Sequence, residues 1–293
     1  MSNNLRKSYG GSPEAIEHHY DVGTDFYSTW LDSRLVYSCA MWDGLSSAAT
    51  LEQAQYRKLE FHANQAGAAS DAKLLDIGCG WGAMLRHLVV ERGVELADGI
   101  TLSPDQHKYI QVSKPPRVRS SLKSWTDYSP DTVYDGIISI GAFEHFADPS
   151  QTQKQRVEVY RLFMRKCADW LTKRGKLSLQ TIAYGNMSAE QANSFMQREI
   201  FPNAELPTLQ EIVAAADGSL EVIRVRNDAL DYAKTCEEWA RRLRKAYRDD
   251  RSICSEEQYE RYIKYLKMSA IGFRMGKLQL LRFKFAKPGW REA

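Results

Sequence analysis

The sequence predicts an α/β protein built on a doubly wound, seven-stranded, mostly parallel sheet, with N-terminal helices and a helical lid insert. Short apolar segments alternate with amphipathic segments from Lys73 onward, as in a parallel sheet covered by helices on both faces. A glycine-rich turn, 78–82, joins the first apolar segment to a helical one. The chain has 293 residues, of which 43% are apolar, so it can bury a full core.

The alternation places strands and helices in order. Strands are expected at 73–77, 95–101, 117–123, 134–140, 175–183, 219–226 and 277–287, and helices at 83–92, 104–112 and 151–173. Residues 1–70 are rich in aromatics and are expected to form a helical cap on a core spanning 71–293. Within that core, 186–216 is too long for a plain loop and is expected to be a substrate lid, and 234–272 a helical insert.

Composition excludes several classes of function. The net charge of +3 is too mild to favour nucleic acid, and no apolar run approaches the roughly 18 residues of a membrane span. Five cysteines without a C-x-x-C pair favour neither disulfides nor a thiolate zinc site, and the pair His18-His19 has no third ligand at useful spacing. The N-terminus is polar, which predicts a cytoplasmic protein, and a homo-oligomer stays open.

The glycine-rich turn indicates the ligand. It reads D-x-G-x-G-x-G from Asp76 to Gly82, whereas a dinucleotide site has G-x-G-x-x-G and an acid about 20 residues further on. The next strand ends at Thr101 without an acid, and no Lys-Ser/Thr pair follows the glycines to make a P-loop. The turn therefore suits an adenosyl ligand without a pyrophosphate, which predicts S-adenosylmethionine.

Two further segments carry candidate catalytic groups. Glu144 and His145 follow the fourth strand, so Glu144 is expected to face the ligand crevice as a base, a cation-binding group or an orienting group. The alternative for Glu144 is an acid favoured by a helix N-terminus. The aromatic residues before the glycine turn could stabilise positive charge on a substrate or simply pack in the core; they are Tyr20, Phe26, Tyr27, Trp30, Tyr37 and Trp42.

A basic stripe is expected on a helix near 237–251. Arg241, Arg244, Lys245 and Arg248 fall at i, i+3, i+4 and i+7 and so share one face. This face is either simply solvated or a docking surface for an anionic head group or an acyl carrier.

With these segments in view, the chain resembles cyclopropane fatty acid synthases, in particular the mycolic acid branch, from about His18 to Pro288. The matching segments are 19–23, 37–40, 51–55, 75–82, 101–103, 139–145, 201–207 and 232–235. The resemblance implies a Rossmann-like class I methyltransferase fold, S-adenosylmethionine as methyl donor and an electron-rich double bond as acceptor. The alkene attacks the methyl group, and a bound bicarbonate ion then takes a proton from the resulting carbocation as the cyclopropane closes.

The resemblance also assigns site residues. It implies that bicarbonate is held by Cys39, Glu144, Ile182, Tyr232 and a histidine, but this chain has Gln180 at the histidine position. A glutamine amide donates a hydrogen bond but cannot carry charge or accept the proton. If an anion is still bound, we expect Glu144 to orient Gln180 or Tyr232 rather than touch the ion, because two nearby anions repel each other. With a glutamine at position 180 we expect the carbocation to be resolved more often without ring closure, and Gln180→His to shift products toward cyclopropane or to make turnover bicarbonate-dependent.

The cofactor residues carried over from the family surround the glycine turn. The methionine moiety is expected near Tyr37, Ser38, Gly78 and Gly80, the ribose near Thr101, Leu102 and Gln106, and the adenine near Trp125 and Thr126, with Asp76, Cys79, Gly82 and Gly141 completing the set.

These residues predict a methyltransferase acting on an alkene carbon of a hydrophobic substrate: a lipid or acyl chain, an isoprenoid-like molecule or another specialised metabolite. Two alternatives stay open. One is an amine N-methyltransferase of a small aromatic metabolite, with Glu144 and His145 near the amine. The other is a cofactor-binding scaffold without transfer activity.

Overall fold

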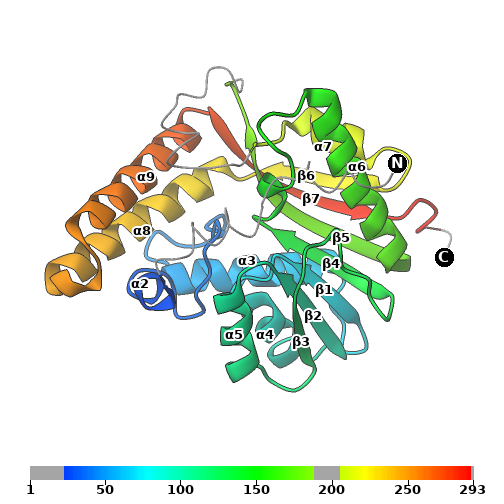
Figure 1. Ribbon diagram of the computed structural model, residues 1–293, viewed down its shortest axis with the longest axis horizontal. Helices are drawn as coiled ribbons and strands as arrows, with labels where there is room; N and C mark the ends of the chain where they lie inside the picture. The colour runs from blue at the N-terminus through cyan, green and yellow to red at the C-terminus, as the bar shows by residue number, and fades with distance from the viewer. Residues whose placement is uncertain (1–22, 188–204, 292–293) are drawn as a thin grey trace.

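The sheet has the predicted class. The computed structural model describes residues 23–187 and 205–291. Its single seven-stranded sheet has the order β3-β2-β1-β4-β5-β7-β6 (Figure 1). The strands are β1 Lys73–Ile77, β2 Leu96–Thr101, β3 Val118–Leu122, β4 Tyr134–Ile140, β5 Leu171–Tyr184, β6 Glu221–Asn227 and β7 Leu278–Ala286. Only β7 runs antiparallel to its neighbours, β5 and β6, which confirms the mostly parallel, doubly wound fold.

Helices cover both faces. Helices α3 (Leu51–Ala66), α4 (Ala83–Val90) and α5 (Pro104–Ser113) share one buried cluster with β1 and β2. Helices α6 (Gln153–Trp170) and α7 (Leu209–Ala216) share another cluster on the opposite face. A Cβ on Gly136 of β4 would lie 2.3 Å from the carbonyl oxygen of Ala66, so only glycine lets α3 lie this close to the sheet. Helix α3 is thus a layer of the core, and the predicted boundary at residue 70 falls inside one folded unit.

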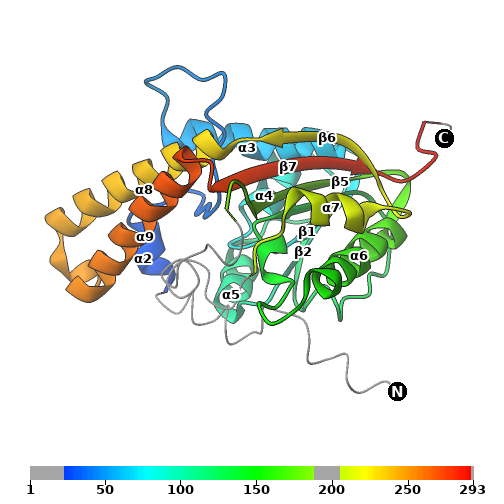
Figure 2. The ribbon, with the colours of Figure 1, turned by 90° about the horizontal axis from the view of Figure 1, so that it is seen from above.

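A lobe of helices lies beyond one end of the sheet. Helices α8 (Ala229–Asp249) and α9 (Glu256–Arg274) pair along their length and extend away from the strands, with α2 (Thr24–Ser28) beside them in both views (Figures 1 and 2). Their buried side chains form a cluster rich in aromatic residues. This lobe contains the aromatic residues predicted before the glycine turn, apart from Tyr20, which lies outside the described residues.

The predicted lid is only partly described, because 188–204 lies outside the described residues. Its last part forms α7, which packs against the core. Ile212, Ala215 and Ala216 are buried with α6, and Arg156 of α6 forms an ion pair with Glu211, with 2.8 Å between Nη2 and Oε1. Helix α7 is therefore part of the cover of the sheet, and the lid predicted over 186–216 stays a prediction.

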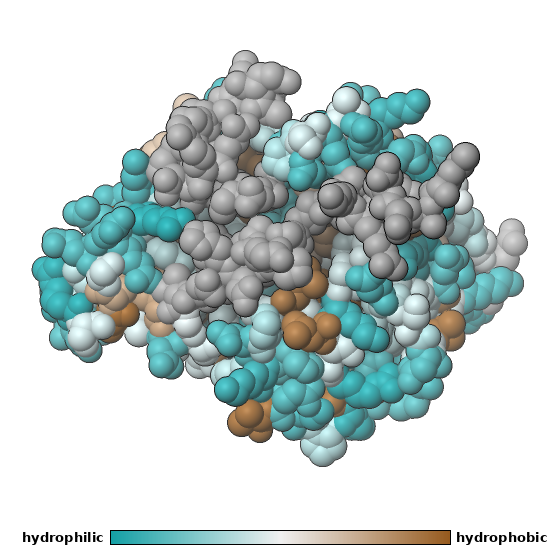
Figure 3. All heavy atoms as spheres, in the orientation of Figure 1, coloured by the Kyte–Doolittle hydropathy of each residue, from teal (hydrophilic) through white to brown (hydrophobic). Residues whose placement is uncertain are grey.

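The visible surface is mostly hydrophilic. Outside the grey residues, the face in Figure 3 carries small, separated hydrophobic patches. Among the described helices, none is both long enough and apolar enough to cross a membrane.

Candidate cofactor and catalytic site

A cavity of about 680 Å³ opens where β1, β2 and β4 end, at the carboxyl edge expected for a doubly wound sheet. Every predicted cofactor residue except Gly82 lines it: Tyr37, Ser38, Asp76, Gly78, Cys79, Gly80, Thr101, Leu102, Gln106, Trp125, Thr126 and Gly141. His145 lines the same cavity.

Three glycines shape this turn in different ways. A Cβ on Gly78, at φ +82°, would lie 2.6 Å from the Cβ of Ala142, so glycine allows the turn to approach the segment after β4. Gly80, at φ +54°, has nothing within 4 Å of its Cβ position and borders the cavity, so its missing side chain leaves room for a ligand. Gly82 has a structural role instead: it caps α4, and a Cβ there would meet Ile110 of α5 at 2.9 Å.

Lys58 is a cavity residue that the sequence analysis missed. It lies on α3 with only 1% of its surface exposed, and its Nζ donates to Oγ of Ser38 at 3.0 Å. Burial lowers the pKa of Lys58 to about 8, and burial raises the pKa of Asp76, on the same cavity wall, to about 7. The available signal was a polar residue on the apolar stripe of a helix, because Leu51, Ala54 and Lys58 follow the i, i+3, i+7 spacing of its buried face.

The predicted catalytic residues meet next to this cavity. Cys39, Ile182 and Tyr232 belong to one buried cluster. The backbone N–H of Ile182 donates to Oε1 of Glu144 at 2.6 Å, while Oε2 of Glu144 is buried without a partner among the described residues. Burial raises the pKa of Glu144 to about 7.

Aromatic rings join the two regions. Tyr37 and Trp81 line the cofactor cavity and also contact the aromatic cluster. The ring of Tyr37 lies 5.5 Å from Trp30 and 5.3 Å from Trp239, between centroids. A substrate beside the cofactor would thus meet a largely aromatic wall.

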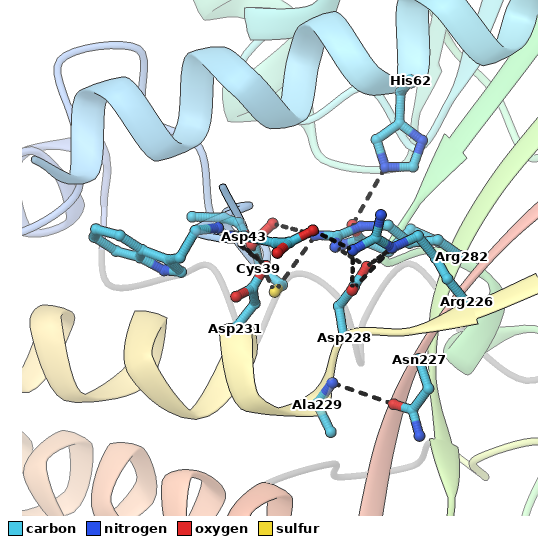
Figure 4. Close-up of polar contacts among 12 residues, drawn as sticks. Cys39, Asp43, His62, Arg226, Asn227, Asp228, Ala229, Asp231 and Arg282 are labelled. Carbon is cyan, nitrogen blue, oxygen red and sulfur yellow. Dashed lines mark hydrogen bonds and ion pairs between the residues drawn. The ribbon is translucent and has the colours of Figure 1, made fainter. Parts of the chain in front are cut away.

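Gln180 is held differently from the expectation. In the described part of the chain, no hydrogen bond joins Glu144 to Gln180 or Tyr232. The orienting role of Glu144 toward a bound anion stays a prediction. Gln180 instead contacts two residues that the sequence analysis did not single out. Its Oε1 lies 2.8 Å from Nε of Arg282 and 3.3 Å from Nε2 of His62. His62 points from α3 toward the buried cluster around Arg282 and Asp228 (Figure 4).

The predicted basic stripe lies on α8, and all four of its side chains are exposed. Arg241 pairs with Glu238 at 2.7 Å and Arg248 with Asp249 at 3.3 Å. Arg244 and Lys245 form no ion pair with any described residue. Acidic residues of the same helix, Glu238 and Asp249, thus neutralise part of the positive charge of the stripe.

The sequence and the fold were compared with known proteins. The family model for mycolic acid cyclopropane synthetase matches residues 9–283. The chain belongs to this family. Cyclopropane mycolic acid synthase 1 of Mycobacterium tuberculosis is 33% identical over 291 residues, which is 93% of this chain and 96% of that protein.

Solved structures of this family have the same fold as this chain. The cyclopropane synthase MmaA2 from Mycobacterium tuberculosis superposes with a TM-score of 0.83 at 31% identity, covering 97% of this chain and 100% of that one. Mycolic acid cyclopropane synthase CmaA1, complexed with SAH and CTAB, also has a TM-score of 0.83 at 31% identity, covering 95% and 99%. The predicted family and fold are therefore confirmed, and the chain is an S-adenosylmethionine-dependent methyltransferase rather than an inert scaffold.

Proposed function

We propose that this member of the cyclopropane synthetase family methylates an alkene carbon of a hydrophobic, lipid-like substrate. The observation that carries the proposal is a buried, aromatic-walled cluster that contains Cys39, Ile182 and Tyr232 and adjoins the cavity at the glycine turn. Glu144 is tied to this cluster by its hydrogen bond from the backbone of Ile182. The related synthase CmaA1 was solved with SAH and CTAB. This pair of ligands, a nucleoside and a long-chain amphiphile, supports a cofactor cavity beside an apolar substrate region in this chain.

The cavity fits S-adenosylmethionine at its amino-acid end. That end is a zwitterion, and the buried charged groups of the cavity wall are the ammonium of Lys58 and the carboxylate of Asp76. Lys123 and Asp127 also line the cavity, but both are exposed. Lys58 forms no ion pair with a described residue and has donors to spare beyond its bond to Ser38. We infer that Lys58 binds the carboxylate and Asp76 the amino group, with Thr101, Leu102 and Gln106 near the ribose and Trp125 and Thr126 near the adenine.

Bound S-adenosylmethionine would supply an electrophilic methyl group. The protein's part is to position the alkene and stabilise the positive charge that develops on it. Aromatic faces attract cations. The second oxygen of Glu144 has no hydrogen-bond partner within 23–187 and 205–291, so it can interact with the charge or accept a proton. Ring closure and formation of a methylated alkene each release one proton, and Gln180 can neither accept it nor supply a charge that would hold a bicarbonate base. The carboxylate of Glu144 is then the group that takes the proton, and its loss from a carbon next to the cation, giving a methylated alkene, is expected more often than ring closure.

Product analysis tests this proposal. The protein is incubated with methyl-labelled S-adenosylmethionine and either vesicles of dioleoyl phosphatidylglycerol or the aromatic amine tyramine. We expect labelled acyl chains one methylene heavier, whose position on carbon is read by mass spectrometry. Labelled tyramine with unlabelled lipid would contradict the proposal and favour N-methylation.

A further inference from the structure

Among the described residues, the side chain of Gln180 is bonded through its oxygen alone. The guanidinium of Arg282 has only donors, so the atom that it meets at 2.8 Å is the amide oxygen. Because that oxygen is an acceptor, Nε2 of His62, 3.3 Å away, must carry a proton. Nδ1 of His62 then accepts from the hydroxyl of Ser178 at 2.8 Å. The guanidinium of Arg282 thus fixes which group donates and which accepts in the hydrogen bonds of Gln180, His62 and Ser178.

Arg282 also ties together the elements that carry the catalytic candidates. It is fully buried on β7, and its Nη1 forms an ion pair with Asp228, the residue before α8. Its Nη2 donates to the carbonyl oxygens of Cys39 at 3.3 Å and Ala40 at 3.2 Å. Asp228 is in turn bonded by Arg226, so the cluster spans β5, β7, the Cys39 segment and the start of α8 (Figure 4).

We propose that His62 and Arg282 are positioning residues that fix the carbonyl oxygen of Gln180, so that its amide NH₂ is the group left to face a ligand. Position 180 is then a fixed hydrogen-bond donor, which suits an acceptor such as an anion or a substrate carbonyl. Gln180 lies two residues before Ile182 on the same face of β5, the face that α3 and the Cys39 segment cover. The ligand part of this inference rests on the proposed function, and the positioning part does not.

The cluster also changes what a histidine at position 180 would do. Two cations act on the imidazole of His62: Lys58 on its own helix and Arg282 on β7. The β5 residues that face it, Ser178 and Gln180, are neutral. The nearby carboxylate of Asp228 is paired with two arginines. Burial, and then these cations, hold the pKa of His62 well below its usual range. An imidazole placed beside Arg282 would stay neutral for the same reason. Gln180→His alone is therefore expected not to restore a protonatable group, which revises the expectation from the sequence.

The first experiment uses the unmodified protein. ¹⁵N NMR of histidine-labelled protein, with His62→Gln to assign the signal, reports the tautomer and titration of His62. We expect the Nε2–H tautomer and a neutral ring from pH 8 to pH 5. A proton on Nδ1, or titration near the usual histidine pKa, would overturn the positioning role.

The second experiment separates the electrostatic effect of Arg282 from general structural effects of substitution. Gln180→His is compared with Gln180→His/Arg282→Gln, with SAH calorimetry as the test of folding. We expect the introduced ring to titrate at least one pH unit higher in the double variant, because the neighbouring cation is gone. Equal titration in the two variants would overturn the role of Arg282.

The third experiment tests the donor. Gln180→Glu keeps an oxygen for Arg282 and His62 but removes the NH₂ group. We expect SAH affinity within twofold of wild type and at least a tenfold loss of turnover on dioleoyl phosphatidylglycerol vesicles. Unchanged turnover would overturn the donor role, whereas an inactive wild type would contradict the proposed function and leave the NMR result to decide the positioning role.

Discussion

At the scale of single residues, Glu144 is buried with one carboxylate oxygen bonded and the other without a hydrogen-bond partner among the described residues. Its Oε1 accepts from the backbone of Ile182, and burial raises its pKa to about 7, so it is ionised mainly above that pH. Glu144→Gln keeps the shape and the bond to Ile182 but removes the carboxylate. If Glu144 assists proton transfer, turnover should fall roughly 10²-fold or more, and wild-type turnover should rise with pH up to about 7 and then level off.

The stability of the same variant gives a control. When folding raises the pKa of a carboxyl, the folded protein loses stability as the pH rises from the unfolded pKa to the folded pKa. The reason is that ionisation of the buried carboxyl costs free energy. Glu144→Gln should therefore melt at a higher temperature than wild type at pH 8 and at the same temperature at pH 4, below the unfolded pKa of the carboxyl. A turnover loss accompanied by a lower melting temperature at both values would point to damaged packing instead.

Lys58 is the second residue whose environment has a measurable consequence. If its ammonium binds the carboxylate of the cofactor, Lys58→Met should weaken SAH binding by roughly tenfold to a hundredfold, the worth of a charge-assisted hydrogen bond. Binding of 5′-methylthioadenosine, which lacks the amino-acid end, should not change. Calorimetry with both ligands decides, since an equal loss for the two would mean that Lys58 only supports the cavity wall.

The pH dependence provides an independent check on Lys58. Its pKa of about 8 means that the ammonium deprotonates as pH rises above that value. Wild-type affinity for SAH should therefore fall above about pH 8, and Lys58→Met should flatten that dependence.

At the scale of elements, the turn between β1 and α4 brings its backbone to the ligand. Gly80→Ala would place a methyl group in the empty space beside the cavity, in addition to a strain of about 1–2 kcal/mol for a left-handed residue. We expect SAH affinity to fall at least a hundredfold by calorimetry.

Gly218 is the matched control for this turn. It lies between α7 and β6 at φ +74°, with nothing within 4 Å of its Cβ position, and does not line the cavity. Gly218→Ala should cost similar stability without weakening SAH binding. Equal SAH affinity in the Gly80→Ala variant and wild type would remove the turn from the binding site.

At the scale of the whole molecule, α3 is a structural layer. Its residues Leu59, Ala63 and Ala66 are buried in the cluster shared with β1 and β2, and Ala66 contacts β4 at Gly136. Removing residues 1–70 would expose that face of the sheet to water. We expect a chain starting at residue 71 to lack a cooperative thermal transition by circular dichroism, whereas a transition like that of the full chain would show that residues 1–70 are a separate cap.

The class of the sheet, the glycine turn and the family could be predicted from the sequence alone, and so could the residues that line the cavity at the turn. These features are local, because a strand followed by a glycine turn and a helix is encoded in consecutive residues, and the carboxyl ends of parallel strands meet at one edge. The matching segments for Cys39, Glu144, Ile182 and Tyr232 were also readable as separate short motifs.

The surroundings of those residues could be known only from the folded chain. His62, Gln180 and Arg282 come from α3, β5 and β7, and no spacing in the sequence links them. In the sequence, Lys58 is an ordinary helix residue; the fold buries it against the cavity, where its Nζ donates to Ser38. Burial of a titratable group, and a charged neighbour beside it, arise only when distant segments pack together. Which atoms carry protons at this site therefore follows from the fold rather than from any one motif.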